Sequence, residues 1–264
     1  MFIFVYATYF IVIVISISGN TIETLNVLKS AKVLNCNIVA FSSGGKMQEF
    51  CTKHNVEFHM IKKTHSPRTS FVTYVYSLLK ILKQLLPLTE NDIVESISVL
   101  EDTQKLINSK NLSETNTSII LSQKISDIPL IYYPHGLEAA AIRFKSSLQE
   151  NAKSHVIIED IIESCHNGIV AWEKPSLLHP ILIQGSDDYF KTKERWQILK
   201  KYFDENNIKY FDIFSTNGNI LSKLIDLIYR LDYVTIYKAI SSEIDPSTIR
   251  SIDFVKNHLD STLE

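Results

Sequence analysis

A chain of 264 residues with 45% hydrophobic and 21% charged side chains can bury one large core or two smaller ones. Its formal net charge of −2 leaves no strongly basic face for nucleic acid and no polybasic anchor for a lipid surface, so small molecules are the expected partners. Three widely spaced cysteines, Cys36, Cys51 and Cys165, form no C-x-x-C pair and cannot all join in internal disulfides, which favours a reducing, cytoplasmic compartment.

The opening stretch, MFIFVYATYFIVIVISIS, carries no charge and could pass for a targeting segment. It lacks the positive n-region and the small-residue cleavage site of a signal peptide. It also falls short of the roughly 20 apolar residues that a membrane span needs. Its second half, FIVIVIS, has the β-branched composition of a strand that is fully buried in a parallel sheet. We therefore expect a buried strand here, with an N-terminal membrane anchor as the alternative.

Strands and helices then alternate. The segment 21–34 has helical periodicity, and NIVAFSS reads as a second strand. A helix over 46–54, the strand EFHMIKK, a helix over 69–84 and the charged amphipathic helix DIVESISVLEDTQKLINS continue the series. One face of the first helix carries Ile22, Leu25, Leu28 and Ala31. This alternation predicts parallel strands that are covered by helices on both faces.

The polar stretch SKNLSETNTS, residues 109–118, interrupts the periodicity and is the predicted linker between subdomains 1–108 and 119–264. A second series follows it. PLIYYP, VIIED, ILIQG and KYFDIFS read as strands, and helices are expected over 137–153, 191–206, 219–240 and 248–261. The sequence therefore predicts an α/β protein with two subdomains, each a mainly parallel sheet between layers of helices.

Residues 16–21, S-I-S-G-N-T, join the first strand to the first helix and form a candidate anion site. The N-terminus of a helix carries about half a positive charge, and its first N–H groups lack partners within the helix. Ser16, Ser18 and Thr21 can add hydroxyl groups, and Gly19 lets the backbone approach a ligand closely. The loop contains no lysine, which suits a sugar phosphate better than a nucleoside triphosphate. The alternative is an ordinary Ser/Asn/Thr helix cap after a core strand.

Several motifs share one resemblance. S-x-S-G-N-T-x-E-T-L resembles the phosphate loop of sugar isomerase (SIS) domains, and AFSSGGKM resembles the strand and turn that follow it there. Further along, SPRTSF, RFKSSLQENAK, ESCHNGIVAWE and YKAISSEIDPSTIRSIDFVKNHL resemble, in order, segments of the bifunctional phosphoglucose/phosphomannose isomerases. The resemblance runs from about residue 10 to near the end of the chain. It implies two SIS-like subdomains with the active site in the cleft between them.

The resemblance also implies an activity, the isomerisation of glucose 6-phosphate or mannose 6-phosphate to fructose 6-phosphate. This reaction needs a base that moves a proton between C1 and C2 through an enediolate, and Glu150 in QENAK matches the base of the family. His166 in ESCHNG matches the histidine that opens the sugar ring, a step that suits an imidazole. In the family this histidine comes from the other subunit, so a homodimer is implied.

Two further residues match the family. Arg68 in SPRTSF corresponds to the arginine that stabilises the enediolate, which a permanently charged guanidinium can do. Thr235 in DYVTIYKA corresponds to the threonine that lies near the C1–C2 end of the substrate and is associated with tolerance of the mannose epimer. No metal or organic cofactor is expected, because glutamate and histidine side chains can carry these proton transfers.

The sequence departs from the family pattern at three places. The family carries an earlier strand with a Gly-Ser-Gly type loop that this sequence does not contain, so we expect the first subdomain to lack that element. Ser242 stands where the family has a lysine, and Lys238 lies one helical turn earlier on nearly the same face. Gly168 replaces a carboxylate after His166. These differences keep a second hypothesis open, a sugar-phosphate-binding SIS protein that does not turn its ligand over.

Overall fold

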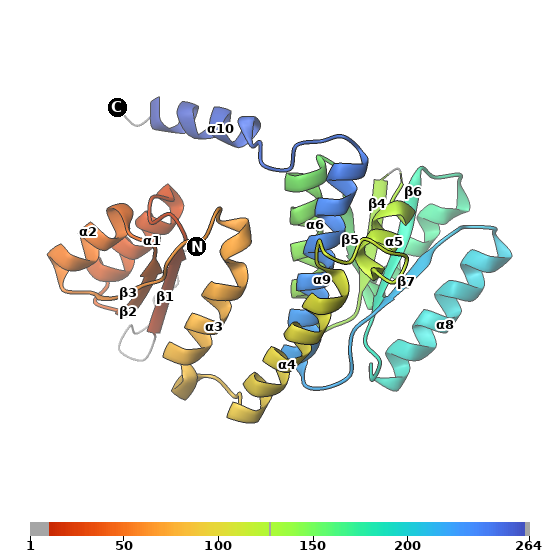
Figure 1. Cartoon of the computed structure of the whole chain (residues 1–264), viewed down its shortest axis with the longest axis horizontal. Coiled ribbons are helices and arrows are strands. Elements are labelled where there is room, and N and C mark those ends of the chain that lie inside the picture. The colour runs from red at the N-terminus through yellow and green to blue at the C-terminus, as the bar shows by residue number, and fades with distance from the viewer. Residues whose placement is uncertain (1–10, 127, 262–264) are drawn as a thin grey trace. The chain divides into compact units, whose positions relative to one another are not determined.

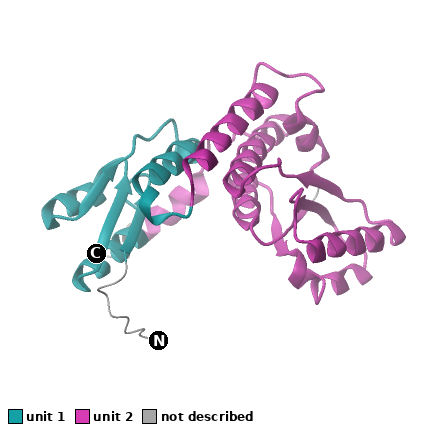
Figure 2. Cartoon of the chain, turned by 90° about the horizontal axis from the view of Figure 1, so that it is seen from below, with its two compact units in different colours: residues 1–87 teal, residues 88–264 magenta. Residues whose placement is uncertain are grey.

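The computed structural model describes residues 11–126 and 128–261, along which strands alternate with helices (Figure 1). The chain divides into two compact units, unit 1 of residues 1–87 and unit 2 of residues 88–264 (Figure 2). Each unit has its own parallel sheet and its own helices. The predicted α/β class with two sheet-containing subdomains is confirmed.

Unit 1 contains a three-stranded parallel sheet in the order β1-β2-β3 among its described residues, formed by β1 (Ile11–Ser16), β2 (Asn37–Ser42) and β3 (Glu57–Met60). Its helices are α1 (Ile22–Val33), α2 (Gly45–His54) and α3 (Phe71–Ile81), with short 3₁₀ turns η2 (Arg68–Ser70) and η3 (Lys83–Leu85). Buried residues of α1 and α2 pack with Val14 and Ala40, whereas Tyr74 of α3 packs with Phe41. Helices therefore contribute to a core on each side of the sheet.

Strand β1 is present as predicted, but it is not buried on both faces. Val14 and Ser16 are 2% and 5% exposed, whereas Ile11, Ile13 and Ile15 are 45%, 42% and 43% exposed. The cause is the period of two along a strand: β1 is an edge of the described sheet, and only one of its faces meets helix α1. The first part of the predicted buried segment, residues 1–10, lies outside the described residues. Within 11–126 and 128–261, no helix has the length and apolar composition that crossing a membrane requires.

Unit 2 contains a four-stranded parallel sheet in the order β5-β4-β6-β7 among its described residues. The strands are β4 (Ile128–Tyr133), β5 (Ile157–Asp160), β6 (Leu178–Gln184) and β7 (Phe211–Phe214). The helices are α4 (Glu90–Ile107), α5 (Thr117–Lys124), α6 (Glu138–Ala152), α7 (Ile161–Ser164), α8 (Phe190–Glu205), α9 (Ile220–Ser241) and α10 (Arg250–Ser261), with a 3₁₀ segment η4 (Gly168–Glu173). The four strands and helices α4, α6, α8, α9 and α10 match the predicted series, whereas α5, α7 and η4 are additional.

Helices cover both faces of this second sheet. On one side Tyr132 and Leu182 pack against Trp172 of η4 and Trp196 of α8. The preceding residue of β4, Ile131, points to the opposite face and is also fully buried. Helices α6 and α9 lie on that opposite side, whereas α8 lies on the first (Figure 1). Unit 2 is therefore a three-layer αβα arrangement.

The division between the units falls earlier than the predicted linker at 109–118, and this expectation is corrected. The predicted boundary places helix α4 in the first subdomain, but α4 packs along α9 and belongs to unit 2. A buried hydrogen bond of 2.8 Å, from the Thr103 hydroxyl to the Asp226 carboxylate, joins these two helices. Thr103 lies on a polar position of α4 but is buried against α9. An amphipathic pattern does not show that a polar position makes such a buried contact with another helix.

The segment 109–118 is an anchored connection rather than a linker. Asn116 within it is fully buried and accepts hydrogen bonds from the first backbone N–H groups of α5. Its amide nitrogen donates to the carbonyl oxygens of Ile107 and Asn111 at 3.0 and 2.8 Å. Asparagine is frequent in loops because it forms such turns and caps, so the composition of this segment indicates a loop without indicating a boundary between units.

Candidate functional site

The β1–α1 loop in unit 1 is a tight turn that is organised around the Ser16 hydroxyl. The Gly19 amide donates to the Ser16 carbonyl oxygen at 3.0 Å and lies 3.1 Å from its Oγ. The Thr21 hydroxyl lies 2.9 Å from Ser16 Oγ. Gly19 adopts a φ of +71°, which a residue with a Cβ rarely tolerates. The predicted phosphate-loop residues Ser16 and Thr21 are therefore in direct contact.

This geometry contradicts the helix-cap alternative. Thr21 occupies the N-cap position of α1, but its side chain accepts no hydrogen bond from the described N–H groups of that helix. Its hydroxyl is paired with Ser16 instead. Ser18 is exposed and accepts a hydrogen bond from the Asn20 amide at 3.2 Å. The loop thus leaves the positive end of α1 without a side-chain cap, as an anion site requires.

A second loop, residues 42–45 between β2 and α2, is hydrogen-bonded to the first. The backbone N–H and the hydroxyl of Ser43 both donate to the Ile17 carbonyl oxygen, at 3.1 and 2.6 Å. The Met47 amide donates to the Gly19 carbonyl oxygen at 2.9 Å. The two loops touch so closely that a Cβ on Gly19 would lie 1.8 Å from the carbonyl oxygen of Gly44. The N-termini of α1 and α2 are consequently fixed together at the carboxyl ends of β1 and β2.

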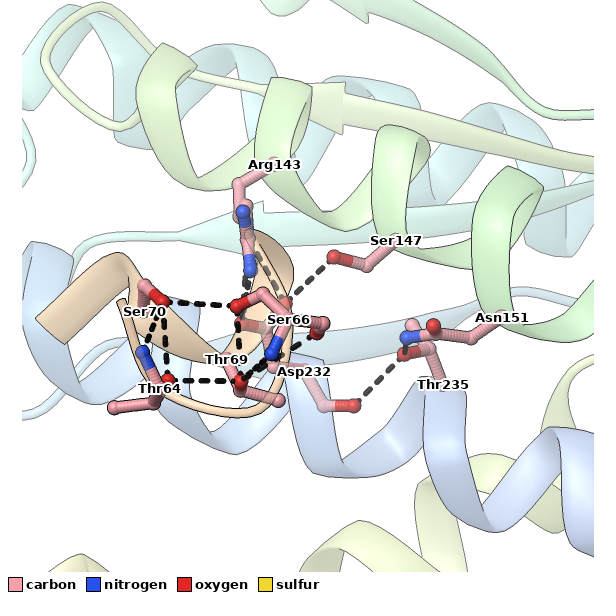
Figure 3. A network of polar contacts seen from close by, with 9 residues as sticks. All are labelled: Thr64, Ser66, Thr69, Ser70, Arg143, Ser147, Asn151, Asp232 and Thr235. Carbon is pink, nitrogen blue, oxygen red and sulfur yellow. Dashed lines mark hydrogen bonds and ion pairs between the residues drawn. The ribbon is translucent and has the colours of Figure 1, made fainter. Parts of the chain in front are cut away.

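Arg68, the predicted enediolate-stabilising residue, lies in η2 of unit 1 and is partly buried. Hydroxyl groups organise the turn around it (Figure 3). Ser70 donates to the Ser66 carbonyl oxygen at 2.8 Å and accepts from the Thr64 amide at 3.0 Å, and the Thr69 hydroxyl accepts from the Ser66 amide at 3.0 Å. The local sequence therefore fixes the backbone that carries the guanidinium.

In unit 2, helices α6 and α9 share a row of polar contacts (Figure 3). The Arg143 guanidinium donates to both carboxylate oxygens of Asp232, with a shortest distance of 2.8 Å. Ser147 donates to the same carboxylate at 2.6 Å. One turn further along α6, the Asn151 amide donates to the hydroxyl of Thr235 at 2.8 Å. The predicted residue Thr235 thus lies in contact with the neighbour of the predicted base, Glu150.

Glu150 itself lies in the last turn of α6 and is partly buried. Its carbonyl oxygen accepts a hydrogen bond from Lys153 Nζ at 2.5 Å, and the same ammonium donates to the Thr248 carbonyl oxygen at 2.7 Å. Lys153 ends the helix in the left-handed conformation. Glu150 and Thr235 thus lie on adjacent helices of one unit, and Thr235 contacts Asn151, the residue that follows Glu150.

His166 is exposed on the turn that follows α7. The turn is held by Glu163, whose carbonyl oxygen accepts from the His166 amide at 2.9 Å and whose carboxylate accepts from Asn167 at 2.6 Å. The 3₁₀ segment after this turn is anchored in the core by Trp172, whose indole N–H donates to the Tyr132 hydroxyl at 2.9 Å. Among residues 11–126 and 128–261, no cluster of three or more histidine, cysteine or acidic side chains could hold a metal ion.

Comparison with known proteins places the chain in a family. Residues 114–259 match the family model described as the bacterial phospho-glucose isomerase C-terminal SIS domain. A bifunctional phosphoglucose/phosphomannose isomerase of Caldicellulosiruptor bescii is 30% identical over 259 residues, which cover 94% of this chain and 76% of that protein. The chain belongs to the bifunctional phosphoglucose/phosphomannose isomerase family. The resemblance identified from the sequence motifs is thereby confirmed.

Other members and structures agree with this assignment. The bifunctional phosphoglucose/phosphomannose isomerase of Aquifex aeolicus is 26% identical over 259 residues, covering 95% of this chain and 76% of that protein. The crystal structure of a hypothetical protein from Thermus thermophilus matches with a TM-score of 0.74 at 12% identity, covering 96% of this chain and 71% of that one. At this identity the structural match supports the fold alone.

Two departures from the pattern of the bifunctional phosphoglucose/phosphomannose isomerases now have a structural description. A Cβ at Gly168 would lie 2.2 Å from a carboxylate oxygen of Glu159 on β5, so the Glu159 carboxylate occupies the space beside this position. Burial, and to a lesser extent the charge of Glu163, raise the pKa of Glu159. Lys238 Nζ donates to the Ile125 carbonyl oxygen at 2.8 Å, so its ammonium is bound at the end of α5. Ser242 caps the end of α9 through its backbone amide.

Sequence reasoning missed the partners that hold the predicted residues. The sequence motifs indicate no role for Asn151 or Asp232. In the structure Asn151 contacts the predicted residue Thr235, and Asp232 accepts a hydrogen bond from Ser147, which lies on the same helix as Glu150. The signal for Asn151 was its place in the quoted motif RFKSSLQENAK, where Arg143, Ser147 and Asn151 recur every fourth residue and so share one helix face. Their partners on α9 are more than 80 residues away in the chain, and no local pattern connects the two segments.

Proposed function

We propose that this protein is an aldose–ketose isomerase that interconverts glucose 6-phosphate, mannose 6-phosphate or both with fructose 6-phosphate. The observation that carries the proposal is the β1–α1 loop, where Ser16 and Thr21 pair with each other and the Thr21 side chain leaves the first described N–H groups of α1 uncapped. Family membership supplies the class of reaction. Our proposal is that this loop, with the exposed hydroxyl of Ser18, binds the substrate phosphate.

The roles of the remaining residues follow the family resemblance. Glu150 is the proposed base that carries the proton between C1 and C2, and Arg68 is proposed to stabilise the charge of the enediolate. Thr235 is proposed to act near the C1–C2 end, which its contact with Asn151 beside Glu150 supports. These steps are proton transfers and charge stabilisation by side chains, so the proposal includes no metal or organic cofactor.

His166 is proposed to open the sugar ring in the active site of the second subunit of a homodimer. Its exposed position on a turn that η4 anchors supports this assignment, because an imidazole that serves a second subunit has to reach the surface of its own chain. A cytoplasmic location is part of the same proposal. It is supported by three free cysteines, which indicate a reducing compartment.

A coupled enzyme assay for the conversion of fructose 6-phosphate to glucose 6-phosphate and mannose 6-phosphate tests the proposal. We expect turnover by the wild-type chain, and a fall in kcat of about 10²–10⁴-fold in Glu150→Gln, because the amide cannot accept the C–H proton. The matched control is Glu138→Gln, which makes the same change at an exposed glutamate in the first turn of the same helix. Wild-type protein that turns over neither hexose phosphate would refute the enzyme assignment.

The second candidate function is a sugar-phosphate-binding protein without turnover. The observation that favours it is that Ser242 stands in place of the family's lysine, while the nearest substitute, Lys238, has its ammonium bound to the Ile125 carbonyl oxygen. Loss of one such donor can cost about 3 kcal/mol of transition-state stabilisation, which silences a moderate enzyme while binding survives. Calorimetric binding of fructose 6-phosphate without turnover would support this function, and loss of that binding in Ser18→Ala would locate it in the loop.

A further inference from the structure

Arg143, Ser147 and Asn151 form a row on one face of α6, because they are spaced at every fourth residue. They face two residues of α9, Asp232 and Thr235, which are one turn apart (Figure 3). Arg143 and Ser147 bind the Asp232 carboxylate, and Asn151 binds the Thr235 hydroxyl. The row therefore ends at the last turn of α6, which is the turn that carries Glu150.

The Thr235 hydroxyl is fully buried, and its single proton has a partner within the chain. It donates to the carbonyl oxygen of Asp232 at 2.8 Å, which is the usual bond of a threonine to its own helix. The Thr235 hydroxyl oxygen in turn accepts a hydrogen bond from the Asn151 side-chain amide at 2.8 Å. In this arrangement Thr235 cannot also donate a hydrogen bond to an oxygen of a substrate. A role for Thr235 at the C1–C2 end therefore requires another route than donation to the sugar.

The last turn of α6 is fixed on both sides of Glu150. On one side Asn151, which is 5% exposed, holds the turn to α9 through Thr235. On the other side Lys153 binds both the Glu150 carbonyl oxygen and the Thr248 carbonyl oxygen. A buried side-chain amide without a hydrogen-bond partner lowers the stability of the fold. The hydrogen bond from Asn151 to Thr235 therefore favours this position of the helix end.

We propose that Asn151 is a positioning residue for Glu150, and that Thr235 acts on the reaction through Asn151 instead of by direct contact with the sugar. This inference rests on the proposed isomerase function and adds a residue to it. A base that is displaced by about 1 Å can cost about 10²-fold in rate, so a small shift of the helix end is sufficient to affect catalysis. The effect falls on kcat, because this turn carries the proposed base and contains no residue of the proposed phosphate-binding loop.

The two possible roles of Thr235 predict different kinetics. If Thr235 contacted the sugar directly, its hydroxyl would influence the two epimers differently, and Thr235→Val would change the ratio of glucose 6-phosphate to mannose 6-phosphate turnover. If Thr235 acts through Asn151, the variant lowers kcat for both epimers by the same factor and leaves KM within about twofold. Thr235→Ser keeps the hydroxyl and should restore most of the rate.

The decisive measurement is a double-mutant cycle of Asn151→Ala and Thr235→Val. Both changes remove the same contact, so we expect each single variant to lose about tenfold or more in kcat and the double variant to be no slower than the slower single one. The matched control is Ser147→Ala, which removes another buried hydrogen bond from the same face of α6, one turn before Asn151. We expect its kcat to stay within about twofold of wild type.

Hydrogen exchange provides a second readout that needs no turnover. Asn151→Ala should speed exchange of the amides at 150–154, and Ser147→Ala should leave these amides unchanged. Wild-type protein without isomerase activity would refute the proposed function, while the exchange experiment would still test the positioning contact. Equal exchange in Asn151→Ala and wild type, a double variant whose loss is the product of the two single losses, or a changed epimer ratio in Thr235→Val would overturn the inference.

Discussion

The two candidate regions of this protein are held in place by different chemistry. The paired loops of unit 1, residues 16–21 and 42–45, are held together largely through backbone groups. The Ile17 carbonyl oxygen accepts from Ser43, and the Gly19 carbonyl oxygen accepts from the Met47 amide in the first turn of α2. The α6–α9 face of unit 2 is joined by side chains, through the contacts of Asp232 and Thr235. The first region requires a residue without a Cβ at Gly19, whereas the second requires a polar side chain on each of the two helices.

This difference predicts how each region responds to substitution. Backbone carbonyl groups are present at every position, so the loops depend on the close approach that glycine permits. Removing one side-chain contact from the α6–α9 face leaves the helices packed through their apolar residues. We therefore expect single changes in the loops to be the more disruptive ones.

The largest expected effect is that of Gly19→Ala. The new methyl group would lie 1.8 Å from the Gly44 carbonyl oxygen at a φ of +71°, so the two loops have to separate. We expect a loss of at least about 2 kcal/mol in the free energy of unfolding, measured by urea denaturation, because backbone strain and a backbone clash act together. Binding of fructose 6-phosphate should be lost as well.

Gly136→Ala is the matched control for that variant. Gly136 also has a positive φ, +90°, but its Cβ would meet only Ile220 Cδ1 at 3.8 Å, which is an ordinary contact. Its cost is therefore the backbone conformation alone, about 1 kcal/mol. Equal losses for the two variants would show that the approach of the loops does not matter, and the proposed contrast between the regions would fail.

A smaller effect is expected for Arg143→Met in unit 2. The Arg143 and Asp232 side chains are 22% and 25% exposed, so the variant leaves a mostly buried carboxylate with Ser147 as a remaining donor. We expect a loss of about 1–2 kcal/mol by urea denaturation, below that of a fully buried pair. Lys191→Met breaks the exposed pair with Glu194 and should cost less than about 0.5 kcal/mol. A loss above that of Gly19→Ala would reverse the expected order.

The same contrast explains which features could be predicted from the sequence. The order of strands and helices followed from period and composition, and the β1–α1 turn followed from its S-I-S-G-N-T sequence, because both are local properties. The N-cap role of Thr21 was the local alternative, and it failed because the Ser16 hydroxyl competes for the same side chain. That competition depends on the folded turn, which the residue types alone do not specify.

Features that join distant segments were not predictable in this way. Helix α4 was assigned to the wrong unit because its partner, Asp226 on α9, is 123 residues from Thr103. The exposed isoleucines of β1 were expected to be buried because composition shows that a strand is apolar, whereas its position at a sheet edge depends on the other strands. The contact of Asn151 with Thr235 belongs to the same class.

The smallest effect concerns the surroundings of Gly168. As at Gly19 in unit 1, a Cβ at this position would overlap a neighbouring group. Here the neighbour is the carboxylate of Glu159, and burial raises the pKa of that group above its ordinary value of 4.5. The folded state therefore binds the proton more tightly than the unfolded state, so stability falls as the pH rises through the folded-state pKa. Glutamine carries no charge at any pH and avoids this loss.

We therefore expect Glu159→Gln to raise the Tm relative to wild type at pH 7 and to have the same Tm below about pH 4, where the wild-type carboxyl is neutral in both states. Scanning calorimetry across this range measures the difference. Glu173→Gln removes an equal charge from an exposed site on the neighbouring 3₁₀ segment and controls for net charge. A Tm difference for Glu159→Gln that does not change with pH would contradict this prediction. It would mean that the charge of Glu159 does not affect the stability of the fold.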